Sequence, residues 1–327
     1  MTKVDLITGI LGSGKTTFIR KYADYLIKKG EKIAILENDF GAVNIDMVML
    51  QDLKCENCQL EMIAGGGDSD CHKRRFKTQL ISLGMQNLDR VIIEPSGIFD
   101  MDEFFDTLYE SPLDRWFSIG SVLTIVDVNT DEKLSKQMEY LFASEAACCG
   151  KIVLSKINQL KDDECLNDKK ESVLNHLNNS LEKINCHRKF TEKDVFCTDW
   201  EKLSEKDFDM LLSSGYRGES YVKLFTNDDI KSGVHYFMHI KLKEDVIEKI
   251  VENIFGDSEC GKIFRIKGSI QNSKGEWLKV NATPEKTDIE TVENGQAVFI
   301  VIGDDVNKNA VDKYFQEYNT DSEYVSI

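Results

Sequence analysis

The segment GILGSGKTT, residues 9–17, has the residue types and spacing needed to bind the phosphates of a nucleotide. Glycines let backbone N–H groups curl around phosphate oxygens, and a following helix adds the partial positive charge of its N-terminus. Lys15 is placed to reach the β- and γ-phosphates as a catalytic residue, and the Thr16 hydroxyl to bind magnesium. We call residues 9–17 the phosphate loop, and its expected nucleotide-binding residues are Gly9, Gly12, Ser13, Gly14, Lys15, Thr16 and Thr17.

A second segment, RVIIEPSG (residues 90–97), places an acid at the end of an apolar run. A carboxylate at the C-terminal end of a parallel strand lies on the ligand side of a doubly wound sheet. We therefore expect Glu94 to hold magnesium, directly or through water, and the Gly97 N–H to contact a γ-phosphate. The alternative is a strand that simply ends in a solvated acid.

The elements that must position these residues alternate between short apolar runs and helical patterns. This alternation predicts an α/β fold, a doubly wound and mostly parallel sheet of the P-loop NTPase kind, over residues 1–215. After Gly215 the pattern changes to alternating strands with two helical stretches, which predicts a small α+β, ferredoxin-like domain over residues 232–327. The strands expected in the first domain are 4–10, 32–39, 90–97, 121–128, 151–158 and 195–200.

Composition narrows the class of protein. The net charge of −16 argues against a nucleic-acid partner, because phosphates demand a basic face. No run of 18 apolar residues appears, and the start has no apolar secretory segment, so we expect a cytoplasmic protein without a membrane partner. In that compartment the nine cysteines should be thiols rather than disulfides.

Several motifs together resemble one family. The phosphate loop, then ILENDFG (35–41), then VIIEPSG (91–97), and then GKIFRIKGSI, GEWLKVNA and GQAVFIVIGDDV resemble in their order the CobW-type P-loop GTPases, relatives of the nickel-insertion GTPases that serve urease and hydrogenase. The resemblance implies a GTP-hydrolysing metal chaperone, or an activator of a metal- or cobalamin-dependent client enzyme. The family's Gly-Cys-x-Cys-Cys cluster corresponds here to residues 67–71, where only Cys71 is a cysteine.

Two further thiols stand upstream of that cluster, in LKCENCQLEMIAGGGDSDCHKRRF, residues 53–76. Cys55 and Cys58 form a C-x-x-C pair, which can grip one tetrahedral ion. We hypothesise that they join Cys71 in a rebuilt transition-metal site, with a fourth ligand from Asp68, Asp70 or His72. Thiolates favour zinc, cuprous copper or an iron–sulfur centre, and the aspartates shift the preference towards zinc, cobalt or ferrous iron. A redox dithiol and three unrelated free thiols remain the alternatives.

The segment ENDFG is interpreted as a switch between nucleotide and metal. In the family it lies between the two, and here Glu37 and the catalytic candidate Asp39 can supply oxygen ligands to magnesium or to the cargo metal. A loop that senses both γ-phosphate and cargo could couple hydrolysis to metal release. The alternative is a strand end with an exposed turn.

The segment KIVLSKIN (151–158) corresponds to the guanine-binding [NT]-K-x-D of the family, with Ser155, Lys156 and Asn158 at the matching positions. A carboxylate accepts from both N1–H and the 2-amino group of guanine, whereas an amide has one acceptor and one donor. Asn158 therefore weakens GTP binding or favours another base. GTP remains the first expectation and ATP the competitor.

Three functions from different classes follow. The first is the nucleotide-driven metal chaperone or activator. It requires Mg²⁺ with the nucleotide, zinc or cobalt as its cargo, and a client metalloenzyme or corrinoid-dependent protein. The second is a small-molecule P-loop kinase, and the third is an ATP-dependent activator or nucleotide-gated binding module without metal cargo. A homodimer is left open as the assembly.

Overall fold

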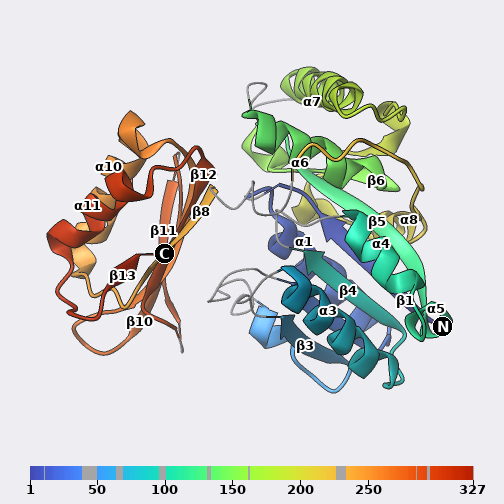
Figure 1. Ribbon diagram of the computed structural model, residues 1–327, viewed down its shortest axis with the longest axis horizontal. Coiled ribbons are helices and arrows are strands. Elements are labelled where there is room, and N and C mark those ends of the chain that lie inside the picture. Colours follow the sequence, from blue (N-terminus) through green and yellow to red (C-terminus); the bar gives the residue numbers. More distant parts are fainter. Residues whose placement is uncertain are drawn as a thin grey trace. The chain divides into compact units, whose positions relative to one another are not determined.

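The computed structural model describes residues 1–10, 12–38, 50–63, 69–95, 101–130, 134–160, 163–225, 233–284, 286–292 and 295–326 (Figure 1). The chain divides into two compact units, residues 1–228 and 229–327. Within the described residues, no helix combines the length and the apolar character needed to cross a membrane.

The first unit is built on a seven-stranded sheet in the order β3-β2-β4-β1-β5-β6-β7. Every neighbouring pair in this sheet is parallel, which confirms the fold class expected from the strand–helix alternation. Its strands are β1 (Thr2–Thr8), β2 (Ile33–Asn38), β3 (Cys58–Ile63), β4 (Arg90–Pro95), β5 (Phe117–Asp127), β6 (Lys151–Ser155) and β7 (Val195–Phe196).

The segments that connect these strands contain α-helices and short 3-10 turns. The α-helices are α1 (Lys15–Lys28), α3 (Ser69–Gly84), α4 (Met101–Tyr109), α5 (Leu113–Trp116), α6 (Lys136–Ala147), α7 (Asp163–Lys183) and α8 (Glu205–Leu212). The 3-10 turns are η1 (Gln51–Leu53), η2 (Ile157–Gln159), η3 (Glu192–Asp194) and η4 (Trp200–Lys202).

Both faces of the parallel sheet are buried. Ile7, Ile35 and Ile92 lie in one core with Phe18 and Ile19 of α1, and Leu211 of α8 joins the same core. Because side chains alternate along a strand, the intervening residues face the opposite side, and there Leu6, Leu36 and Ile93 are also fully buried. A sheet covered on both faces needs apolar residues at nearly every central position, as VDLIT, IAIL and VII provide.

A buried ion pair between Asp5 and Arg90 lies towards the N-terminal ends of the strands. Asp5 is fully buried and accepts hydrogen bonds from Tyr22 Oη at 2.8 Å, Ser121 N at 2.7 Å and Arg90 Nη1 at 2.7 Å. Burial is the largest influence on Asp5 and raises its pKa above the usual value, with Arg90 acting in the opposite direction. This cluster ties β1, β4 and α1 together and lies outside the phosphate-binding edge.

The second unit has a six-stranded antiparallel sheet in the order β11-β10-β9-β12-β8-β13. Strands β8 and β9 both run antiparallel to β12 between them, and α10 joins them. Strands β12 and β13 flank β8 in the same way and are joined by α11, so the unit has the two split βαβ motifs of a ferredoxin-like fold with β10 and β11 added. The elements are β8 (Val234–Met238), η6 (Glu244–Val246), α10 (Ile247–Gly256), η7 (Ser258–Cys260), β9 (Lys262–Gln271), β10 (Trp277–Thr283), β11 (Lys286–Val292), β12 (Val298–Asp304), α11 (Lys308–Tyr318) and β13 (Val325–Ser326).

The two helices of this unit share one face of its sheet. Ile250 and Ile254 of α10 and Phe315 of α11 lie in one core with Phe237 and Phe299 from the strands.

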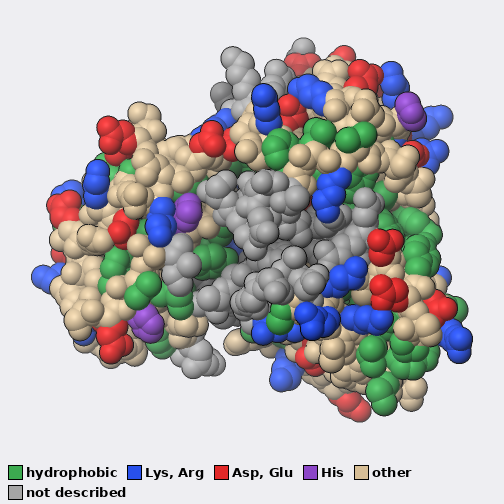
Figure 2. Space-filling model, in the orientation of Figure 1, with side chains coloured by type: hydrophobic (Ala, Val, Ile, Leu, Met, Phe, Trp, Pro, Cys, Tyr) green, Lys and Arg blue, Asp and Glu red, His purple; other side chains and the backbone are tan. Residues whose placement is uncertain are grey.

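On the face of the molecule drawn in Figure 2, basic and acidic side chains of the described residues are intermixed.

Candidate functional site

The phosphate loop leaves β1 at Thr8 and enters α1 at Lys15. Its glycines Gly9, Gly12 and Gly14 all have positive φ, at 136°, 80° and 102°, which only glycine adopts readily. At Gly9 a Cβ atom would also lie 2.3 Å from the carbonyl oxygen of Ile125, so no other residue fits. The strand–glycine–helix connection expected from the sequence is therefore present.

The N-terminus of α1 is open for an anion. Gly14 caps the helix without any side-chain hydrogen bond, and the first turn holds no acidic residue. Uncapped N–H groups at a helix start, with the helix dipole behind them, form an anion site. Ser13 is 1% exposed, and its Oγ has no hydrogen-bond partner among the described residues. These features fit the phosphates of a nucleotide.

Lys15 and Thr16 are held in place by neighbouring groups. Lys15 Nζ donates to the Gly9 carbonyl at 2.7 Å, which folds the lysine back over the loop. Thr16 Oγ1 donates to Glu94 Oε1 at 3.1 Å. The structure thus brings together the loop threonine and the strand-end carboxylate that the sequence pairs as magnesium ligands.

Glu37 and Glu94 lie side by side at the C-terminal edge of the sheet. The two residues are register partners on the parallel strands β2 and β4, so their side chains project to the same face about 4.8 Å apart at the backbone. Both belong to the rows that face α1, where Ile35 precedes Glu37 and Ile92 precedes Glu94. They are 3% and 8% exposed. Two buried carboxylates beside a threonine hydroxyl form an oxygen set suited to a hard divalent cation.

The thiols of the hypothesised metal site are not brought together. Cys55 and Cys58 exchange backbone hydrogen bonds of 3.0 and 3.2 Å in a tight turn that precedes β3, and Cys58 pairs with Ile33 at the start of β2. Cys71 lies in α3, which follows the other end of β3. The strand between them spans about 16 Å, at about 3.3 Å per residue, so Cys55 and Cys58 lie at the edge of the sheet opposite to the phosphate loop.

The environment of Cys58 also disfavours a thiolate. Its side chain is 1% exposed and lies in the core under α1. Burial, with a smaller contribution from Cys55, raises the pKa of the Cys58 thiol to about 12. Among the residues that the structure describes, no group of three His, Cys, Asp or Glu side chains is placed to hold a metal ion. The three-thiolate cage is therefore not formed by these cysteines.

Several predicted residues lie outside the described part of the chain. Asp39, Asp68 and Gly97 are among them, and the side chains of Asp70 and His72 are likewise not described. Their roles stay predictions.

The base-binding segment begins where β6 ends, at Ser155, three residues earlier than the strand predicted from the sequence. Lys156 has a left-handed backbone, with φ of 59°, and its ammonium pairs with Asp127 at the end of β5. Asn158 is exposed in the turn η2. Trp200 and Ser155 both border the loop glycine Gly14, since a Cβ there would lie 3.4 and 3.7 Å from them. The base segment, Trp200 and the phosphate loop therefore share one edge.

One buried acid at this site was not singled out from the sequence. Glu145 of α6 is 1% exposed, and its Oε2 accepts a hydrogen bond from Gly9 N at 2.8 Å. Burial, partly offset by Lys15 and the Gly9 N–H, raises the pKa of Glu145 to about 7. The available signal was a lone carboxylate within FASEAACC, a stretch of small and apolar residues whose side chains are buried from Phe142 to Cys149.

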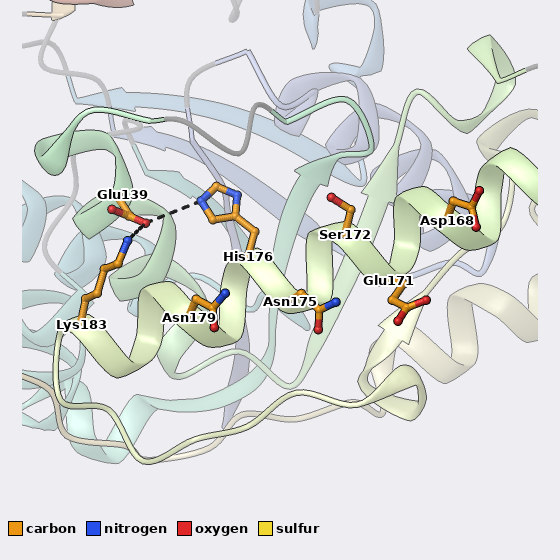
Figure 3. Close-up of a pocket in the computed structure, with 8 residues that line it drawn as sticks. All are labelled: Glu139, Asp168, Glu171, Ser172, Asn175, His176, Asn179 and Lys183. Carbon is orange, nitrogen blue, oxygen red and sulfur yellow. Dashed lines mark hydrogen bonds and ion pairs between the residues drawn. The ribbon is translucent and has the colours of Figure 1, made fainter.

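A polar depression of about 480 Å³ lies along α7 and includes Glu139 of α6 (Figure 3). Figure 3 shows Glu139 pointing towards His176 and Lys183. Glu139 pairs with Lys183, accepts from Ser180 Oγ at 3.3 Å and lies 3.8 Å from His176 Nε2. This carboxylate is satisfied by its neighbours, in contrast to Glu145 on the same helix.

Comparison with known proteins agrees with the geometry. The family model described as "CobW/HypB/UreG, nucleotide-binding domain" matches residues 3–187. The chain is 33% identical over 159 residues to the zinc chaperone YeiR of Escherichia coli (strain K12), covering 48% of this chain and 47% of that protein. It is 27% identical over 174 residues to the zinc chaperone YjiA of the same organism, covering 51% and 52%. The chain thus spans about half the length of the curated relatives it matches.

A solved structure, the Zn(II)-bound YjiA GTPase from E. coli, aligns over 98% of this chain and 99% of that one, at 16% identity and a TM-score of 0.34.

Proposed function

The chain belongs to the CobW/HypB/UreG family, and from that premise we propose that it hydrolyses GTP to drive the delivery of a transition metal, zinc, to a client protein. Zinc is chosen because the matched relatives YeiR, YjiA and the CobW protein of Pseudomonas aeruginosa are described as zinc chaperones. The client is proposed to be a metalloenzyme or a corrinoid-dependent protein in the cytoplasm.

The observation that carries this proposal is the register between Glu37 and Glu94. Glu94 receives the hydrogen bond of Thr16 and so belongs to the nucleotide side of the site. Glu37 lies directly beside it on β2, the strand that leads into the predicted switch segment 37–41. The two carboxylates are one strand spacing apart, so a change of ligand at one of them would change the electrostatic environment of the other.

The proposed hydrolysis depends on positioning and charge neutralisation. The open N-terminus of α1 and the folded-back Lys15 would bind the phosphates, and Thr16 with Glu94 would hold magnesium. Magnesium, when bound, neutralises developing charge on the phosphate oxygens. The walls of the phosphate site are buried, which strengthens each of these interactions relative to water.

The proposed cargo site lies at the same edge, with Glu37 and Cys71 as its first candidates. Cys71 is half-buried in the first turn of α3, the helix that follows the C-terminal end of β3. Asp39, Asp68 and Asp70 are the further candidates from the sequence. Zinc accepts such mixed thiolate and carboxylate ligands.

Two measurements test the proposal. Phosphate release from GTP with no added acceptor, increased by zinc, is expected for a chaperone, whereas a small-molecule kinase requires an acceptor. Zinc affinity is then measured with GDP and with a non-hydrolysable GTP analogue, for the native chain and for Glu37→Gln. Equal zinc affinity in both nucleotide states would refute the coupling.

A matched control is available on the neighbouring strand. Glu61 of β3 is paired with Leu36 rather than with Glu37, so its side chain projects from the opposite face. It accepts a hydrogen bond from Gln79 at 2.8 Å. Glu61→Gln removes a carboxylate one register position before Glu37 and should leave the zinc affinity unchanged.

A further inference from the structure

Glu145 contacts the phosphate loop at its first glycine. Its Oε2 accepts from Gly9 N at 2.8 Å, while the carbonyl of Gly9 accepts from Lys15 Nζ at 2.7 Å. The N–H and the carbonyl of Gly9 thus connect the buried carboxylate with the lysine that reaches the phosphates. The role assigned to Glu145 below rests on the proposed nucleotide binding.

The backbone of Glu145 is anchored as firmly as its side chain. Thr8 Oγ1 and Thr124 Oγ1 lie 3.2 and 3.0 Å from the Glu145 carbonyl oxygen, and the two hydroxyls lie 2.8 Å from each other. Thr8 is the last residue of β1, and Thr124 is its register partner on β5. This buried network fixes the backbone of Glu145, and the Gly9 N–H holds its carboxylate.

The second oxygen of this carboxylate has an unusual place. Glu145 Oε1 is buried and has no hydrogen-bond partner among the described residues. A proton can bind there without breaking a hydrogen bond, because Oε2 keeps the Gly9 N–H as its donor. The surroundings thus oppose the charged form of the side chain and tolerate the neutral one.

The charged groups around Glu145 decide how a nucleotide would act on it. Among the described residues Lys15, from α1, is the charged side chain that stabilises the carboxylate, while β1 and β5 present the neutral hydroxyls of Thr8 and Thr124. A bound triphosphate would pair with the Lys15 ammonium and so weaken its attraction to the Glu145 carboxylate. The triphosphate would also add negative charge of its own. Both changes favour protonation of Glu145.

We propose that Glu145 is a positioning residue of the phosphate loop that takes up a proton from solvent when a nucleoside triphosphate binds. The carboxylate becomes a carboxylic acid, and the proton is returned when the phosphates leave. Nucleotide binding and pH are therefore linked through this residue, and nucleotide affinity falls as the pH rises.

The size of the effect follows from the charges. One net negative charge about 10 Å away raises the proton affinity of a carboxylate about tenfold at an effective dielectric constant of about 20. Because the pKa of Glu145 is about 7 before binding, this change gives an uptake of about half a proton per nucleotide at pH 7.5. Over the range from pH 6 to pH 9 the affinity falls roughly eightfold.

The test is calorimetric titration of the chain with a non-hydrolysable GTP analogue and magnesium, in two buffers of different ionisation enthalpy at pH 7.5. The native chain should take up about half a proton more than Glu145→Gln. The amide of the variant still accepts from Gly9 N–H but cannot titrate, so its affinity should be insensitive to pH apart from the ionisation of the nucleotide. The variant should bind several-fold tighter than the native chain at pH 9.

Glu139→Gln is the matched control, because it removes a carboxylate from the same helix that is paired with Lys183. It should retain the native proton uptake. Equal uptake by the native chain and Glu145→Gln overturns the inference while the proposed function stands. Absence of binding at every pH overturns the proposed function together with it. If Glu145→Gln does not fold, a native chain whose affinity shows only the pH dependence of the nucleotide overturns the inference by itself.

Discussion

Separate replacement of Cys58, at the start of β3, and Cys71, in the first turn of α3, distinguishes two possible metal sites. One is the cargo site proposed from the structure, and the other is the three-thiolate site predicted from the sequence. We expect Cys71→Ser to lower zinc affinity at least about tenfold, since loss of one charge-assisted ligand bond costs about 1.5 kcal/mol or more. Cys58→Ala should leave the zinc affinity unchanged within about twofold, the difference that is ordinarily resolved in such titrations.

The magnitude for Cys58 follows from its burial. Metal binds the thiolate, and a thiol with a pKa of about 12 is ionised in fewer than about one molecule in a thousand at pH 7.5. Zinc could recruit it only by drawing the sulfur out of the core that it shares with α1. A cation held at the phosphate-binding edge cannot do so across the length of β3.

The assay is competitive titration of zinc against a chromophoric chelator at pH 7.5 under reducing conditions, with cobalt as a spectroscopic substitute that reports thiolate ligation. Thermal unfolding of each variant is measured alongside, because Cys58→Ala removes a buried sulfur and should cost about 1 kcal/mol of stability. Cys55→Ser serves as the exposed control in the same turn. A loss of zinc affinity in Cys58→Ala equal to that in Cys71→Ser would refute the reasoning.

Three further predictions concern the base, the cation and the fold. Asn158→Asp should tighten GTP binding about 10- to 100-fold, because a carboxylate accepts both donors of guanine and such charged hydrogen bonds contribute about 1.5–3 kcal/mol; ATP affinity, measured in parallel, should not rise. Thr16→Ala should lower magnesium-dependent phosphate release at least about tenfold while magnesium-free GDP binding changes little. Arg90→Met should reduce the free energy of unfolding by about 3–5 kcal/mol at pH 8, because it leaves Asp5 buried and uncompensated. Since the pKa of Asp5 is raised in the folded state, that loss should shrink as the pH falls, and urea unfolding at pH 8 and pH 5 measures it.

The parallel sheet and the phosphate loop could be predicted because local sequence determines them. The glycines of the loop are required by positive φ, and the apolar run before the loop and the helical pattern after it follow from periodicity alone. Glu94 and Glu37 could be placed as well, because a residue at the C-terminal end of a parallel strand lies at a known edge. The pairing of Glu37 with Glu94 needed only the strand order.

The error over the cysteines came from β3, which the sequence did not reveal. CQLEMI (58–63) has no continuous apolar run and alternates only from Cys58 to Met62, and four of its six residues are partly or fully exposed because the strand lies at the edge of the sheet. Read as a loop, the segment could fold Cys58 back to Cys71. Once it is a strand, the same residues hold the two thiols apart, so a missed edge strand changed the predicted chemistry.

Glu145 could not have been assigned from the sequence for a different reason. Its partner Gly9 is 136 residues away, and the contact exists because α6 packs where β1 and β5 end. The structure thus places a buried carboxylate at each end of the phosphate loop: Glu145 at Gly9 and Glu94 at Thr16. Their surroundings assign them opposite tasks. Glu94 has a hydroxyl and a second carboxylate beside it, a set suited to a divalent cation, and bound magnesium would stabilise its charged form. Glu145 has an oxygen without a partner among the described residues and a lysine that the nucleotide would draw away, and so it is stabilised in the neutral form by the same binding event. One ligand complex would therefore fix the charge of one acid and remove that of the other, which is how a loop of nine residues can be held in a single bound geometry from both ends.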